Sequence, residues 1–108
     1  MELAKEITFI CDEIKRLFDV EKIIVFSIKR CEKNNCVTDL DVCVVSNVVP
    51  EDRNAWLKKA YLEIDSEIPF DLFLYTPEDW ESLTQDDSSF ASRIARKGCV
   101  VFEKKENS

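Results

Sequence analysis

Asp39 and Asp41 are separated by a single leucine at the start of an apolar run that continues to Ser46. In an extended strand the side chains at i and i+2 point to the same face, so both carboxylates project together. Two neighbouring negative charges repel, and a fold keeps such a pair where a cation lies between them. Carboxylate oxygens are hard donors that suit Mg2+. The pair therefore predicts a divalent-metal site at one end of a strand.

A third acid, Asp71, interrupts another β-favouring run, over residues 68–75. This carboxylate would be costly to bury without a partner. If the two strands are neighbours, Asp39, Asp41 and Asp71 form a three-carboxylate cluster able to hold one or two Mg2+ ions for phosphoryl chemistry. A simpler interpretation stays open, in which Asp39 caps a strand start, Asp41 is exposed and Asp71 is an edge acid. The apolar residues around all three favour the cluster.

Hydrophobic periodicity predicts the elements that position these acids. Apolar residues at helical spacing predict an amphipathic helix over residues 2–18, with its apolar stripe against a sheet. A nearly continuous β-branched and aromatic run predicts a central strand over residues 22–28, covered on both faces. The polar segment over residues 29–37 then leads into the strand that carries Asp39 and Asp41.

The second half of the chain predicts three more helices and two more strands. Pro50 opens a helix that continues to Ile64 and packs beside the first. After the strand of Asp71, Thr76 is the expected N-cap of a short helix, with Asp79 at the capping-box position usually held by Glu or Gln.

A last helix over residues 88–97 stops at Gly98 and leads into a closing strand over residues 99–103. The order α-β-β-α-β-α-α-β predicts a small α/β (α+β) domain, with a mixed sheet of about four strands and helices packed on it. We expect residues 1–103 to form this one domain and residues 104–108 to be a frayed tail.

Composition limits the classes of function. No apolar stretch approaches the roughly 20 residues that span a bilayer, and the first residues lack the pattern of a signal peptide, so we expect no membrane association and a cytoplasmic location. The net charge of -7 argues against binding a nucleic-acid backbone, which requires a basic surface. The acidic charge suits a basic protein partner, or serves solubility alone.

The chain has five cysteines and no histidine. Without a secretion signal, an odd number of cysteines indicates reduced thiols rather than a disulfide framework. Cys11, Cys43 and Cys99 lie in apolar runs and are expected in the core. Cys31 and Cys36 flank a polar loop and make a poor zinc site without histidine. Any general base must accordingly be a carboxylate or a lysine.

Taken together, these motifs resemble the minimal nucleotidyltransferase family of the DNA-polymerase-beta superfamily, over nearly the whole chain. The family signature is an apolar strand ending in Gly-Ser, a loop, Asp-x-Asp on the next strand and a third Asp on a later strand. Positions 39–41 match the Asp-x-Asp pair, Asp71 matches the third acid, and residues 23–26 match the first strand. Residues 90–103 are similar to the family's final helix, glycine turn and strand.

The chain departs from this family at the Gly-Ser motif. Counting back from Asp39 over the family's loop length puts Ser27 in the place of the glycine and Ile28 in the place of the serine. Glycine lets the backbone approach phosphate, and serine supplies a hydroxyl and an amide, whereas Ile28 offers only its amide. A shift of one residue puts Ser27 in the serine's role, still without the glycine. Lys29 and Arg30 follow, either to neutralise phosphate oxygens or as two solvated loop cations.

The resemblance implies a Mg2+-dependent transfer of a nucleoside monophosphate, with ATP as the expected donor, to a hydroxyl of a protein partner. Asp39 and Asp41 would hold one or two Mg2+ ions, and Asp71 would share one ion and help to draw the proton from the attacking hydroxyl. The expected contacts to the nucleotide are Ser27, Ile28, Lys29 and Arg30.

The partner of this family is often an all-helical HEPN-type protein, which would make the chain the antitoxin of a toxin–antitoxin pair. A homo-oligomer stays open as a further assembly. Two other functions also stay open. The domain could have kept the fold and acids but lost turnover with its Gly-Ser motif, and act by covering its partner. Alternatively, it could be a structural domain whose acids bind no metal.

Overall fold

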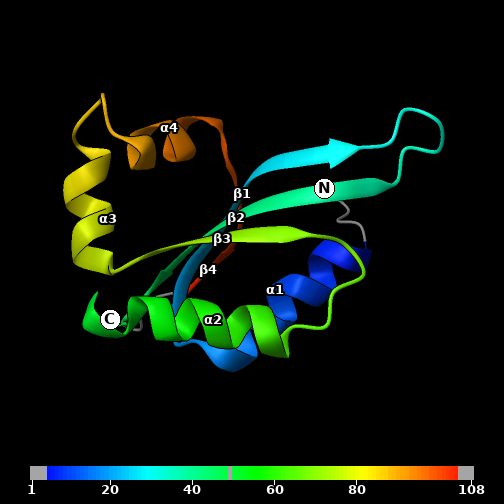
Figure 1. Cartoon of the computed structure of the whole chain (residues 1–108). Coiled ribbons are helices and arrows are strands. Elements are labelled where there is room, and N and C mark those ends of the chain that lie inside the picture. Colours follow the sequence, from blue (N-terminus) through cyan, green and yellow to red (C-terminus); the bar gives the residue numbers. More distant parts are fainter. Residues whose placement is uncertain (1–4, 49, 105–108) are drawn as a thin grey trace.

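The structure is a computed structural model that describes residues 5–48 and 50–104. These residues form an α+β fold in which a four-stranded mixed sheet carries four α-helices, as the order of elements predicted (Figure 1). The helices are α1 (Lys5–Leu17), α2 (Arg53–Glu63), α3 (Pro77–Thr84) and α4 (Phe90–Lys97). The strands are β1 (Val20–Arg30), β2 (Val37–Ser46), β3 (Phe70–Tyr75) and β4 (Cys99–Glu103).

The strands lie in the order β3-β2-β1-β4. β1 pairs antiparallel with both β2 and β4, whereas β2 and β3 run parallel and are joined through α2. β1 and β2 are therefore the two central strands, and their β-branched sequences agree with burial on both faces. β2 and β3, the strands of the three predicted acids, are direct neighbours, as the metal-site hypothesis required.

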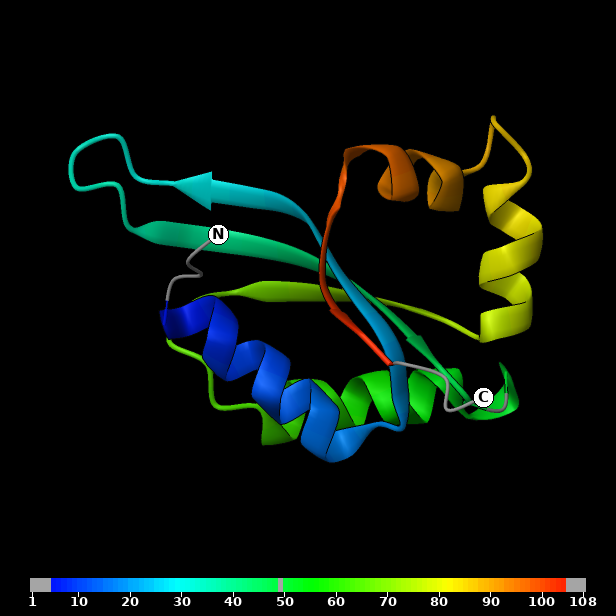
Figure 2. The same ribbon diagram turned by 180° about the vertical axis from the view of Figure 1, so that it is seen from behind.

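Helices lie on both faces of the sheet (Figures 1 and 2). α1 and α2 share one face, where the main core includes Ile10 and Ile14 of α1, Ala60 of α2, and Val42 and Val44 of β2. α1 buries a continuous apolar stripe in this layer, and α2 buries Ala60 there.

α3 and α4 cover part of the opposite face. There a smaller cluster joins Ile94 of α4 to Ile24 of β1 and Cys43 of β2, with Trp80 of α3 packed against it. Alternation along β2 assigns the residues of this cluster and those of the main core to opposite faces. The sheet is thus covered along its length on one side and at one end on the other.

Side-chain caps begin α3 and α4. The backbone N–H of Asp79 donates to the Thr76 hydroxyl (3.1 Å), so Thr76 is the N-cap that the sequence predicted. Ser89 caps α4 by accepting from the N–H of Ser92 (2.9 Å), and the helix begins at Phe90, two residues later than predicted. The Asp79 carboxylate lies 3.5 Å from Arg53 Nη2 of α2, an ion pair that links the two helical layers.

Further predicted details differ from the structure. β1 extends from Val20 to Arg30 rather than over residues 22–28, because the polar residues after Ile28 continue the antiparallel ladder with β2. The loop of the hairpin is shortened to residues 31–36. Cys99 is exposed, which makes its placement in the core wrong, because β4 is an edge strand with one open side. Cys11 and Cys43 are buried as expected.

The expected tail begins with an ordered residue. The backbone N–H of Lys104 donates to the Glu21 carbonyl (2.8 Å), and its ammonium lies 3.6 Å from the Asp19 carboxylate. Residues 105–108 of that prediction lie outside the described residues, as do residues 2–4 of the predicted first helix. No helix within residues 5–48 and 50–104 combines the length and apolar character needed to cross a membrane.

Candidate functional site

Asp41 and Asp71 lie opposite each other on neighbouring strands. The parallel register of β2 and β3 pairs these two residues directly, so their side chains project from the same face of the sheet. Asp39, two residues before Asp41 on β2, belongs to the same face by alternation. Asp41 is half-buried, whereas Asp39 and Asp71 are exposed. All three predicted acids therefore lie on the face that α3 and α4 cover only in part.

A β-bulge in β1 brings two more predicted residues to this face. Val25 pairs with Val42 and Ser27 pairs with Asp41, which leaves Phe26 as the extra residue of the bulge. Beyond the bulge Ser27 faces Asp41, and Lys29 faces Asp39. Without the extra residue the alternation would turn both side chains to the opposite face. The bulge thus adds one hydroxyl and one ammonium group beside the carboxylates.

The other two predicted nucleotide contacts lie elsewhere. Ile28 pairs with Leu40, so it belongs to the face opposite the acids, and its side chain is 40% exposed. The Arg30 guanidinium donates from Nη1 to the backbone carbonyl of Asn35 (3.1 Å) across the hairpin loop. Asn35 itself has a positive φ of 58°, a conformation that asparagine tolerates in tight turns. The structure therefore groups Ser27 and Lys29 with the acids and leaves Ile28 and Arg30 outside the group.

Burial raises the pKa of the Asp41 carboxyl above its usual range, and the facing Asp71 carboxylate raises it further. The Lys29 ammonium and the Ser27 hydroxyl act in the opposite direction without cancelling the shift. The carboxylate of Asp41 is thus held in a place that disfavours its charge. A cation between Asp41 and Asp71 would remove that penalty, because an opposite charge favours the ionised form.

The chemistry of the donors suits Mg2+, which is commonly bound through one or two carboxylates together with the phosphates of a substrate. Within residues 5–48 and 50–104, no three acidic or cysteine side chains come close enough together to hold a metal ion by themselves. The register supplies the Asp41–Asp71 pair, with Asp39 one step further along β2 and opposite a lysine. The pair fits a cation that also has phosphate ligands better than it fits a closed protein cage.

An aromatic cluster borders the acids on the same face, and it was not predicted from the sequence. Phe26, Phe73 and Phe90 pack ring against ring, with centroid distances of 5.2, 5.7 and 5.4 Å. We call these three residues the phenylalanine cluster. The spacing of Phe73, two residues after Asp71, is a signal that could have assigned it to this face. Nothing in the sequence indicated that Phe90 of α4 would join it.

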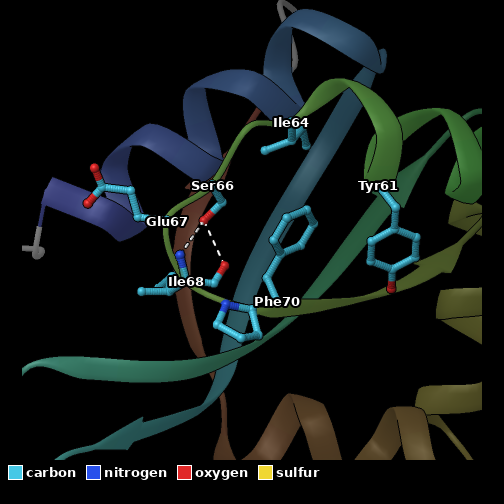
Figure 3. Close-up of a pocket in the computed structure, with 7 residues that line it drawn as sticks. Tyr61, Ile64, Ser66, Glu67, Ile68 and Phe70 are labelled. Carbon is cyan, nitrogen blue, oxygen red and sulfur yellow. Dashed lines mark hydrogen bonds between the residues drawn. The ribbon is translucent and has the colours of Figure 1, made fainter.

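An open pocket of about 400 Å3 lies between the end of α2 and the start of β3 (Figure 3). One of its hydroxyls is already paired, because Ser66 donates to the Ile68 carbonyl (2.8 Å) and accepts from the Ile68 N–H (3.1 Å). The Tyr61 hydroxyl accepts from the N–H of Leu72 on β3 (2.8 Å). Phe70 of this pocket precedes Asp71 and so belongs to the opposite face of the sheet. The pocket is separate from the acids.

Comparison of the chain with protein-family models, with curated proteins and with solved structures gives no match.

Proposed function

We propose that this protein is a Mg2+-dependent nucleotidyltransferase of the minimal nucleotidyltransferase type. It would transfer a nucleoside monophosphate from a nucleoside triphosphate, with ATP as the expected donor, to a hydroxyl of a protein partner. The observation that carries this proposal is the pairing of Asp41 with Asp71 on one face of the sheet, where Asp41 has a raised pKa. Such a penalty on a carboxylate is removed when a metal ion binds.

In the proposed reaction the oxygen of the acceptor hydroxyl forms a bond to the α-phosphorus, and the bond from that phosphorus to the pyrophosphate leaving group breaks. Asp71, the more exposed member of the pair, would also help to draw the proton from the hydroxyl, since a chain without histidine must use a carboxylate or a lysine as its general base. Asp41 and Asp71 would together hold the Mg2+ and its triphosphate, with Asp39 close by on β2. When bound, Mg2+ offsets the charge that develops on the phosphate oxygens.

Ser27 and Lys29 are the proposed phosphate contacts of this chain. Both face the acids across the β1–β2 ladder, so a phosphate held at the carboxylates through Mg2+ lies within the reach of a serine hydroxyl and a lysine ammonium. Lys29 would neutralise phosphate oxygens as a point charge, which replaces part of what the family obtains from its Gly-Ser turn.

The direct test incubates the purified protein with Mg2+, ATP labelled on its α-phosphate, and the product of the neighbouring gene. We expect label on the acceptor protein. We expect Asp41→Asn and Asp71→Asn each to lower the transfer rate about 100-fold, the upper end of the effect seen when groups around a bound metal are lost. Asp65→Asn is the matched control, because Asp65 is an exposed acid on the loop before β3. No transfer by the wild type, or equal transfer by Asp41→Asn, would refute the enzyme.

A second candidate is a binding module that has lost turnover and neutralises a HEPN-type helical partner by contact. It is favoured by the continuity of β1, which passes through Ser27 and Ile28 as paired strand rather than as a tight turn around phosphate. Calorimetric titration with ATP and Mg2+ separates the two candidates. The enzyme requires metal-dependent affinity for the nucleotide, whereas the module neutralises its partner without it.

A further inference from the structure

The phenylalanine cluster is assembled from three separate elements. Phe26 is the bulged residue of β1, Phe73 lies on β3, and Phe90 is the first residue of α4. The rings of Phe26 and Phe73 meet at 5.2 Å across the intervening strand β2. On β2 the residue paired with Phe73 is Cys43, which is fully buried. The two rings therefore bridge over β2 at Cys43.

The phenylalanine cluster lies two residues further along β2 and β3 than the proposed metal site. Asp41 precedes Cys43 by two residues on β2, and Asp71 precedes Phe73 by two residues on β3. Two residues of extended strand span about 6.6 Å. Phe26 is also directly followed by Ser27, which faces Asp41. The cluster accordingly forms an apolar wall beside the carboxylates, on the side toward α3 and α4.

Phe90 completes the wall with an exposed aromatic surface. The Phe90 ring packs edge-on against Phe26, with an interplanar angle of 85°, and tilted against Phe73, with an angle of 56°. Both rings therefore hold Phe90 in place. Even so, 44% of Phe90 remains exposed. An aromatic ring that packs on two others and keeps an open surface beside the proposed phosphate site suits base stacking, in which any nucleobase presents a π face.

We propose that the phenylalanine cluster is the nucleobase platform of the nucleotide site, with the base stacked on Phe90 while its phosphates lie at Asp41 and Asp71. This inference rests on the proposed function, because it needs the phosphates at the carboxylates. Stacking on an aromatic ring tolerates all bases, so the platform favours a nucleotide over a bare polyphosphate without selecting one base strongly. The charges of the nucleotide suit this placement as well. The uncharged base lies on the apolar rings, while the Mg2+-bound phosphates lie at the acids.

The test compares two probes by calorimetry in excess Mg2+, ATP and inorganic tripolyphosphate, which has the phosphates but no base. We expect the wild type to bind ATP more tightly than tripolyphosphate. Phe90→Leu keeps an apolar side chain but removes the π face, and it should weaken ATP about tenfold while leaving tripolyphosphate unchanged. Phe9→Leu is the matched control, because Phe9 is also 44% exposed but lies on α1, on the other side of the sheet.

The outcomes separate this inference from the proposed function. Equal affinity of the wild type for the two probes, or an equal effect of Phe90→Leu on both, overturns the platform and leaves the metal site standing. Binding of neither probe overturns both proposals. If Phe90→Leu does not fold, contacts between base and ring protons are measured by NMR on the wild type with ATP and Mg2+. Contacts to Phe90 support the platform, and contacts to none of the three rings overturn it.

Discussion

The Asp41 carboxyl carries a cost that a metal ion would relieve. Burial and the facing Asp71 carboxylate raise the pKa of Asp41 in the folded protein. In the unfolded chain the same carboxyl has the ordinary pKa of an aspartate. The folded state thus binds the Asp41 proton more tightly than the unfolded state. The resulting stability is fully present below the ordinary aspartate pKa and is lost as the pH rises through the folded value. At neutral pH, without metal, Asp41 lowers the stability of the fold.

Asp41→Asn should therefore stabilise the metal-free protein at pH 7, by about 0.2–1 kcal/mol, because it removes a like-charge pair opposed across two strands. The gain should shrink toward zero as the pH falls below about 4, where the wild-type carboxyl is protonated. Urea unfolding of both proteins between pH 3.5 and 7.5 in a chelator measures the difference.

Asp39→Asn is the control for this experiment, since Asp39 faces Lys29 rather than another acid. Its removal should leave stability unchanged or lower it slightly. A lower stability of Asp41→Asn at pH 7, or a difference that does not vary with pH, would show that the Asp41 charge is not unfavourable in the metal-free fold.

Residue types and alternation were enough to predict that Asp39 and Asp41 share a face. The direct pairing of Asp41 with Asp71 depends on the register of β2 and β3, which the strands' own sequences do not determine. The assignment of Cys99 to the core failed for a related reason. An apolar run predicts a strand, but only the order of strands decides whether a strand lies at the edge.

Among the elements, α4 determines where Phe90 of the phenylalanine cluster lies beside the acids. Its last turn passes so close to β1 that only a glycine fits at residue 98. A Cβ there would clash with the Cγ2 of Ile24 and lie 2.7 Å from the Ile94 carbonyl oxygen. Gly98 has an ordinary φ of -79°, so the requirement is for space rather than for an unusual backbone. This close approach fixes one end of α4, and Phe90 stands at the other.

Gly98→Ala should destabilise the protein by about 1–3 kcal/mol, the usual cost of forcing a methyl group into a packed interior. Thermal or urea unfolding measures the loss. In a double-mutant cycle with Ile24→Ala, which removes the obstructing Cγ2, the combined loss should be smaller than the sum of the two single losses. Strict additivity would mean that α4 shifts away from β1 instead of meeting Ile24.

Helix and strand types followed from periodicity and caps, and the Thr76 cap was predicted to the residue. The bulge at Phe26 was not predicted, because a bulge depends on how two strands pair and the sequence of β1 alone does not indicate it. Beyond the bulge, β1 runs past Ile28 to Arg30, where we expected a loop. The bulge, more than any single residue type, assigns Ser27 and Lys29 to the acidic face.

In the molecule as a whole, the two faces of the sheet are covered unequally. α1 and α2 lie along one face, while α3 and α4 lie over one end of the other (Figure 2). The carboxylates occupy the less covered part of that second face, with Asp39 and Asp71 exposed to solvent. The acids therefore lie on the side of the sheet that the helices cover less.

An acidic molecule offers a cation many places to bind. The chain has 22 aspartates and glutamates against 15 lysines and arginines, so a weak general attraction of Mg2+ is expected over the surface. A specific site must be distinguished from this background. Other paired acids, such as the exposed neighbours Asp86 and Asp87 before α4, serve as internal controls.

The most direct test locates the cation itself, with Mn2+ as a paramagnetic substitute for Mg2+ in NMR spectra of the uniformly labelled protein. At substoichiometric Mn2+, the amide signals of residues 39–42 and 70–72 should broaden before any others, recover on addition of excess Mg2+, and stay sharp in Asp71→Asn. Broadening that begins at residues 86–87, or that spreads evenly over the acidic surface, would contradict a metal site between Asp41 and Asp71.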